Sequence, residues 1–134
     1  MAGAPFVLRA QSKTDRPTAA VIGVGVRGSG LARTAVDFAD LLVVCDVNQK
    51  SAKNIAKVLE KNGRQPKAVR DFRRVLDDKA IDAVFIATPH HWHTPIAVRA
   101  LEAGKHVFCE KPPALNAAEV AEMKTVAESA GKVL

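Results

Sequence analysis

The stretch VIGVGVRGSG, residues 21–30, decides the fold of this chain. Gly23, Gly25 and Gly28 form the pattern GxGxxG directly after an apolar run that predicts a strand and directly before a predicted helix. In such a pattern the first glycine permits a tight turn, the second lets the backbone approach a pyrophosphate, and the third brings helix and strand close together. The phosphates then rest on free N–H groups of the helix N-terminus, which begins near Val26. The stretch therefore predicts a dinucleotide-binding turn.

An acidic residue ends the next predicted strand. Asp46 lies 18 residues after Gly28 and follows the apolar run at residues 41–45. A carboxylate in this place accepts hydrogen bonds from ribose hydroxyls and repels a 2′-phosphate, so it favours NAD over NADP. Arg27 has two interpretations, because its guanidinium could pair with the pyrophosphate or reach the 2′-phosphate of NADP. We expect NAD as the cofactor, with NADP as the alternative.

Short apolar runs alternate with helical patterns from residue 18 to the end, which is typical of βαβ units around a parallel sheet. The predicted strands are 19–24, 41–45, 68–69, 83–87 and 106–109. Their continuous apolarity predicts strands that are covered on both faces. We expect an α/β fold, a Rossmann-type doubly wound parallel sheet over residues 18–134. Lys132 and the two residues after it look like the start of a sixth strand, where the sequence breaks off.

Capping residues mark the ends of two predicted helices. Thr94 is expected as the N-cap of one helix, which stops at Gly104. Asn116 and Glu119 have the spacing of a capping box that opens a later helix, and Gly131 is expected to close it. In the helix after the glycine turn, Leu31, Ala35 and Phe38 are expected to share one apolar face.

The net charge of +6 raises the question of nucleic-acid binding, which the positions of the basic residues answer. Many lysines recur at helical spacing opposite apolar residues, which is the pattern of a solvated face. They are Lys50, Lys53, Lys57 and Lys61, opposite Ala52, Ile55, Ala56 and Leu59. Single-strand binders also use exposed aromatic residues for stacking, and this chain has no Tyr and one Trp. We therefore expect no nucleic acid as a partner.

Residues 1–17 show no periodicity and end in turn-forming residues, so we interpret them as a disordered tail or the remnant of an export signal. The compartment is cytoplasmic as the chain stands, and periplasmic if the tail is such a remnant. No apolar run approaches the ~20 residues that a membrane span needs, so we expect no membrane partner. Cys45 and Cys109 form no CxxC pair, and we interpret them as packed thiols.

Polar residues follow the fourth and fifth predicted strands, within TPHHWHTPIAVRALEAGKHVFCEKPP, residues 88–113. In a sheet of order 3-2-1-4-5, ligands bind beyond the carboxyl ends of the strands, where the order reverses between the first and the fourth. Thr88, Pro89 and His93 leave the fourth strand, and Glu110 and Lys111 leave the fifth. We therefore expect these five residues to border the same cofactor site.

Two features of this region leave alternatives open. Pro112 biases Lys111 toward an extended backbone, and the bond between them is either cis or trans. Trp92 either stacks beside the nicotinamide ring or packs beneath the following helix.

Three histidines lie within four residues, but no nearby Cys, Asp or Glu completes a coordination set, so we expect no metal. They are His90, His91 and His93.

These motifs together resemble a known group, the glucose-fructose oxidoreductase and inositol dehydrogenase-like family (Gfo/Idh/MocA). The resemblance covers residues 18–134 and rests on AAVIGVGVRGSG, IDAVFIATP, the His93 position before a helix, AGKHVFCEKP and the final helix. It implies that Lys111 is a catalytic residue, which lies near nicotinamide and substrate and assists binding or proton transfer. It also implies that Glu110 lies beside the cofactor.

The resemblance further implies hydride transfer between the nicotinamide cofactor and a hydroxyl-bearing carbon of a sugar, polyol or related metabolite. Family members carry a C-terminal substrate domain that is absent here, so we expect little turnover from this chain alone and a homo-oligomer for the full-length parent. One alternative is an NAD-dependent glycoside hydrolase, whose equivalent of EKP tends to read EVP, although TPHHWH resembles its TPxxWH pattern. A second alternative is a non-catalytic NAD-binding module.

Overall fold

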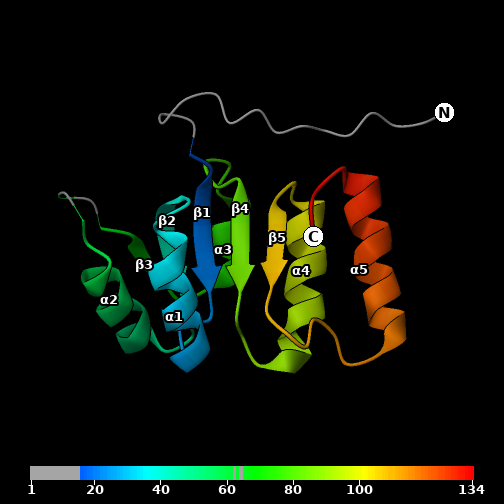
Figure 1. The fold of residues 1–134 in the computed structure, drawn as a ribbon, viewed down its shortest axis with the longest axis horizontal. Coiled ribbons are helices and arrows are strands. Elements are labelled where there is room, and N and C mark those ends of the chain that lie inside the picture. Colours follow the sequence, from blue (N-terminus) through cyan, green and yellow to red (C-terminus); the bar gives the residue numbers. More distant parts are fainter. Residues whose placement is uncertain (1–15, 62, 64) are drawn as a thin grey trace.

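The fold is built around one parallel β-sheet. The structure is a computed structural model, which describes residues 16–61, 63 and 65–134. The strands of the sheet are β1 (Thr18–Ile22), β2 (Asp40–Cys45), β3 (Lys67–Val69), β4 (Ala83–Ile86) and β5 (His106–Cys109). Their order is β3-β2-β1-β4-β5, as the sequence predicted (Figure 1). The order reverses between β1 and β4, so the turns after these two strands face each other at the carboxyl edge of the sheet.

Helices cover both faces of this sheet (Figure 1). They are α1 (Val26–Ala35), α2 (Gln49–Val58), α3 (Phe72–Asp77), α4 (His93–Glu102) and α5 (Ala117–Ala130), with a short 3₁₀ helix, η1 (His90–Trp92), before α4. α1 and α2 pack on one face, α3 and α4 pack on the other, and α5 packs against α4. The Rossmann-type doubly wound architecture is thus confirmed.

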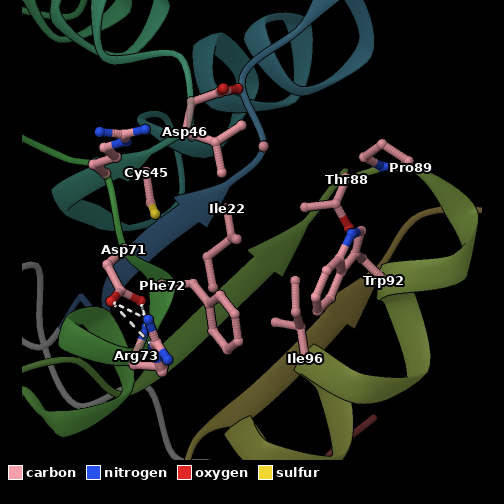
Figure 2. Close-up of a pocket in the computed structure, with 13 residues that line it drawn as sticks. Ile22, Cys45, Asp46, Asp71, Phe72, Arg73, Thr88, Pro89, Trp92 and Ile96 are labelled. Carbon is pink, nitrogen blue, oxygen red and sulfur yellow. Dashed lines mark hydrogen bonds and ion pairs between the residues drawn. The ribbon is translucent and has the colours of Figure 1, made fainter.

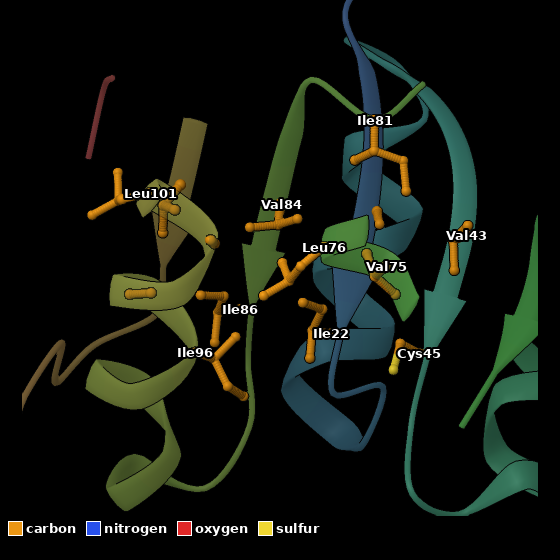
Figure 3. Close-up of a cluster of buried hydrophobic side chains, with 14 of the residues drawn as sticks. Ile22, Val43, Cys45, Val75, Leu76, Ile81, Val84, Ile86, Ile96 and Leu101 are labelled. Atoms are coloured by element: carbon orange, nitrogen blue, oxygen red, sulfur yellow. The ribbon is translucent and has the colours of Figure 1, made fainter. Parts of the chain in front are cut away.

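The core lies on both sides of β1. The four residues from Ala19 to Ile22 are between 0 and 2% exposed, which confirms the prediction from their continuous apolarity. Side chains of alternate strand residues enter two separate clusters, one beneath α3 and α4 and one beneath α1 and α2. Figure 3 shows Ile22, Val84 and Ile86 of the first cluster beside side chains from the covering helices. Burying each such aliphatic side chain contributes ~1.5–3 kcal/mol.

The buried face of α1 differs from the predicted one. Phe38 lies beyond the end of the helix and is 71% exposed, and Leu31 is only half-buried. Of the predicted face, Ala35 is buried as expected, and the helix buries Gly28 and Ala32 beside it. Because the glycine turn brings α1 close to the sheet, small residues fit between them where larger side chains would not.

The lysine face of α2 is confirmed for Lys50, Lys53 and Lys57, which are exposed opposite the buried Ala52 and Ala56. The predicted continuation was wrong. α2 ends at Val58, so Lys61 is exposed but lies outside the helix.

The expected N-cap of α4 was also wrong. α4 begins at His93, directly after η1, and Thr94 lies buried in its first turn, where its hydroxyl donates to Glu119 Oε2 at 3.0 Å. Asn116 caps α5 as predicted, because its Oδ1 accepts from the N–H of Glu119 at 3.0 Å. The other half of the capping box is shifted by one residue, since Glu119 Oε2 accepts from the N–H of Leu115 at 2.8 Å. Gly104 and Gly131 end their helices with left-handed φ values of 78° and 63°.

The interpretation of residues 1–17 as a tail stays a prediction for most of its length. Residues 1–15 lie outside the described residues, but Arg16 donates to the carbonyls of Val36 and Ala39, and Pro17 O accepts from the N–H of Asp40 at 2.9 Å. At the other end, residues 132–134 form no strand, although Val107 N–H donates to a carbonyl there at 2.9 Å. No helix in the described part of the chain has the length and apolarity to span a membrane.

Candidate functional site

The glycine turn joins β1 to α1 and has the geometry that its sequence pattern predicts. Gly23 has a φ of 86°, and a Cβ there would lie 2.8 Å from backbone atoms of Ala87 and Thr88. A Cβ on Gly28 would lie 1.8 Å from the carbonyl oxygen of Gly23, so only glycine permits this approach of α1 to the sheet. A Cβ on Gly25 would meet nothing within 4 Å. The space in front of α1 is therefore open at the position where the pattern expects a pyrophosphate.

Asp46 is fixed beside this turn by two backbone hydrogen bonds. Its Oδ2 accepts from the N–H of Val24 at 2.8 Å, and its Oδ1 accepts from the N–H of Asn48 at 2.8 Å. Each carboxylate oxygen has two acceptor sites, so lone pairs stay free for other donors. The end of β2 thus presents a positioned carboxylate to the glycine turn.

An ion pair connects the glycine turn to the segment after β5. Arg27 Nε, in the first turn of α1, donates to Glu110 Oε1 at 2.8 Å. Glu110 is buried, and its N–H extends the sheet by donating to Ile86 O at 2.9 Å. Desolvation alone would raise the pKa of Glu110, but the hydrogen bonds from Arg27 and from the N–H of Lys111 lower it overall. Glu110 is therefore an anion that joins the two predicted halves of the site.

Lys111 lies next to this ion pair. Its side chain is exposed, and among the described residues its amine has no hydrogen bond or ion pair. The sequence left open whether the Lys111–Pro112 peptide bond is cis or trans, and in the structure it is cis.

His93 lies next to this segment and is buried, with 1% of its surface exposed. Its Nδ1 is 2.7 Å from Pro112 O and its Nε2 is 2.8 Å from Thr88 O, so a polar contact with a cofactor would require one of these bonds to break.

A cavity of about 470 Å³ opens between the ends of β1, β2, β3 and β4. Figure 2 shows Ile22, Phe72, Ile96 and Trp92 around its middle, with Asp46 at one end. An apolar slot with a carboxylate at its end suits a flat aromatic base that carries a hydroxylated sugar. Thr88 also borders this cavity, and its buried Oγ1 has no hydrogen-bond partner among the residues that the structure describes. The residues present therefore fit a dinucleotide.

Sequence reasoning missed the residues that β3 and α3 contribute to this cavity. They are Arg70, Asp71, Phe72 and Arg73, together with Val47 after β2. β3 is only three residues long, so the signal for a strand that delivers side chains to the site was weak. Arg73 pairs with Asp71 at 2.7 Å, and this hydrogen bond lowers the pKa of Asp71 to about 2. The side of the cavity near β3 thus carries a fixed ion pair.

The other aromatic and sulfur-containing residues near the site have defined places. Trp92 is half-exposed and borders the cavity beside Ile96 of α4. Cys45 is buried at the cavity, and burial, assisted by neighbouring carboxylates, raises its pKa to about 12. Burial likewise raises the pKa of Cys109 to about 11. Neither thiol is disulfide-bonded, as expected for packed cysteines.

His90 and His91 are exposed on η1. Within residues 16–61, 63 and 65–134, no group of His, Cys, Asp and Glu is arranged to hold a metal ion. The histidine cluster therefore does not assemble around a common centre, since His93 turns inward to two carbonyl groups.

Comparison with known proteins agrees with the geometry of the site. The model of the Gfo/Idh/MocA group, an oxidoreductase family with an NAD-binding Rossmann fold, matches residues 18–134. The chain belongs to this family. It is thus an NAD-binding Rossmann domain of an oxidoreductase family, as the glycine turn and the segment after β5 predicted.

Three similar proteins illustrate the range of the family. A glycosyl hydrolase family 109 protein of Shewanella putrefaciens is 32% identical over 90% of this chain and 28% of its own length. Inositol 2-dehydrogenase of Salmonella paratyphi B is 32% identical over 85% of this chain and 34% of its own length. The crystal structure of GenD2 from gentamicin A biosynthesis, in complex with NAD, is 28% identical with a TM-score of 0.83, covering 96% of this chain and 36% of that one. The chain thus spans about a third of the length of these relatives.

Proposed function

We propose that this chain is the cofactor-binding part of a dehydrogenase that uses NAD and acts on a hydroxyl-bearing carbon of a sugar or polyol. The observation that carries this proposal is the Arg27–Glu110 ion pair of 2.8 Å, because it holds the glycine turn and the Lys111 segment at one edge of the sheet. The similarity to inositol 2-dehydrogenase supports the substrate class. NAD is preferred over NADP in this proposal because Asp46 would repel a 2′-phosphate.

Each part of the dinucleotide has residues suited to hold it. Free N–H groups at the start of α1, next to Gly25 and Val26, suit the pyrophosphate. Asp46 suits the ribose hydroxyls, and the part of the cavity near β3 suits the adenine. Thr88, Pro89, Glu110 and Lys111 would then lie toward the nicotinamide. Thr88 Oγ1 is buried and has no hydrogen-bond partner in the described part of the chain, so a hydrogen bond to such a ligand would satisfy it.

Lys111 is the residue that we assign to the chemistry. When bound, the nicotinamide accepts or gives the hydride. The ammonium group of Lys111 can donate a hydrogen bond to the substrate oxygen and stabilise the negative charge that develops on it during hydride transfer. The exposed amine of Lys111 supports this role, because it is not engaged by the described part of the chain.

Replacement of Lys111 by Met in the intact protein tests this assignment. Loss of a group that stabilises charge on the substrate oxygen or transfers a proton lowers kcat by about 10²–10⁴-fold. The Kd for NAD should change little. Lys79→Met is the matched control, because Lys79 is an exposed lysine at the opposite edge of the sheet. A Lys111→Met variant with undiminished kcat would contradict the role of this lysine.

A second function is supported by a specific similarity. The family 109 relative and the TPHHWH sequence of residues 88–93 favour a glycoside hydrolase that oxidises its sugar only transiently. Such an enzyme shows no net change in the absorbance of NADH during turnover, whereas a dehydrogenase accumulates NADH. This assay with the intact protein separates the two functions.

A further inference from the structure

The segment that carries Lys111 is fixed at both ends. On one side, Glu110 is bonded to Arg27 through its side chain and to Ile86 through its N–H. On the other side, Pro112 O is 2.7 Å from Nδ1 of His93. Lys111 lies between these two attachments, so the direction of its side chain depends on both.

His93 joins this segment to the end of β4. Its Nε2 is 2.8 Å from Thr88 O, so the ring bridges the residue after β4 and the residue after Lys111. The ring is 1% exposed, and water therefore does not compete for either nitrogen. His93 opens α4, whose next residue, Thr94, is bonded to Glu119 of α5. The rigid start of α4 thus holds the imidazole in place.

We propose that His93 is a positioning residue, which connects Thr88 O and Pro112 O through its two ring nitrogens and thereby sets the direction of Lys111 toward the nicotinamide. This inference rests on the proposed function, because it assigns Lys111 to the reaction. It gives His93 a role that does not require contact with the cofactor.

Both partners of His93 are carbonyl oxygens, which only accept hydrogen bonds, so the ring is the donor in any hydrogen bond with them. The other ionisable groups near the ring are Glu110 and Lys111 beside Pro112, Glu119 beyond Thr94, and His90, whose ring centroid is 5.6 Å away.

The hydrogen bonding of His93 can be measured directly in the intact protein by ¹⁵N-edited NMR of its imidazole groups. We expect the ring N–H of His93 to be hydrogen-bonded and to exchange slowly with water, unlike that of the exposed His91. A His93 ring N–H that exchanges as fast as that of His91 would overturn the bridge. This measurement requires no variant, so it stands even if a substitution at His93 prevents folding.

The effect on catalysis is tested with His93→Gln, because both N–H donors of a glutamine lie on one nitrogen and cannot span the two carbonyls as the two ring nitrogens do. Because a displacement of about 1 Å at a reacting group costs about 10²-fold, we expect kcat to fall by about that factor while the Kd for NAD changes by less than about threefold. His91→Gln, an exposed neighbour, is the matched control and should keep wild-type kcat. Unchanged kcat in His93→Gln would overturn the inference. If wild-type protein bound no NAD, the proposed function would fail, whereas the imidazole spectra would still decide whether the bridge exists.

Discussion

Gly28 and Gly30 lie two residues apart in α1 but differ in their surroundings. A Cβ on Gly28 would overlap the carbonyl oxygen of Gly23 at 1.8 Å, whereas a Cβ on Gly30 would meet nothing within 4 Å. We expect Gly28→Ala to destabilise the fold by several kcal/mol, because helix and strand must separate. Gly30→Ala should stabilise it by about 0.5–1 kcal/mol, because alanine is the better helix former. Thermal unfolding of both variants checks this, and equal shifts in Tm would contradict the geometry of the turn.

In the proposed site, Asp46 recognises the ribose by accepting hydrogen bonds from its hydroxyls. Replacing Asp46 by Asn keeps its size but removes its charge, and hydrogen bonds to a charged group contribute ~1.5–3 kcal/mol. We therefore expect the Kd for NAD to rise about tenfold or more, and the ratio of affinities to move toward NADP. Calorimetric titration with both cofactors measures this. Asp37→Asn, at an exposed aspartate after α1, is the control and should bind like wild type.

The two thiols give a prediction on pH. The pKa of Cys45 is raised from 9.0 to about 12, and that of Cys109 to about 11, because burial disfavours the thiolate. Since the thiolate is the reactive form, both cysteines should react slowly with a thiol reagent at pH 8 and rapidly after denaturation. The stability that comes from keeping Cys45 protonated is present below pH 9 and is lost as pH rises toward 12. Fast labelling of Cys45 in the native protein would show that it is not buried.

At the scale of elements, the start of α5 depends on a single side chain. Asn116 Oδ1 accepts from the N–H of Glu119, and removing an N-cap of this kind typically costs ~1 kcal/mol. We expect Asn116→Ala to lower the free energy of unfolding by about this amount, and Asn116→Asp to retain wild-type stability because aspartate caps equally well. Denaturant unfolding distinguishes the two variants. The same stability for Ala and Asp would mean that the cap does not contribute.

The strands, the helix ends at glycine and the helix start at Asn116 were predictable, because each depends on residues close together in the sequence. Continuous apolarity marked β1, and left-handed φ values require residues such as Gly104 and Gly131. The error at Thr94 had a different origin, since η1 supplies the turn before α4 and releases Thr94 for a bond to Glu119, which follows it by 25 residues. Such a long-range partner leaves no periodic signal in the sequence.

In the whole molecule, the sequence predicted that the strand ends meet at one edge of the sheet. It did not predict which side chains of the site form hydrogen bonds and ion pairs with each other. Parallel topology brought the ends of β1, β2, β4 and β5 to one edge, as expected. The Arg27–Glu110 pair and the two carbonyl partners of His93 depend on side-chain directions that sequence spacing does not fix. The contribution of β3 and α3 to the cavity was missed for the same reason.

Two phenylalanine side chains lie on one sheet face over β4 and β5. Phe108 is 51% exposed and packs against Phe85 with ring centroids 5.7 Å apart, beyond the part of this face that α1 and α2 cover. Because an exposed aromatic pair on a sheet favours association, we expect the 134-residue chain to self-associate and Phe108→Lys to reduce this. Sedimentation velocity measures the effect. Val58→Lys, at an exposed position of α2, is the control, and a monomeric wild-type chain would contradict the expectation.

In the proposed site, the glycine turn and the Lys111 segment border one nicotinamide dinucleotide. Titration of the ¹⁵N-labelled protein with NAD, followed by amide NMR, tests this arrangement. We expect the signals of Val24 to Arg27 and of Glu110 and Lys111 to shift together with one midpoint. Shifts confined to one of the two segments, or no shift at all, would contradict it.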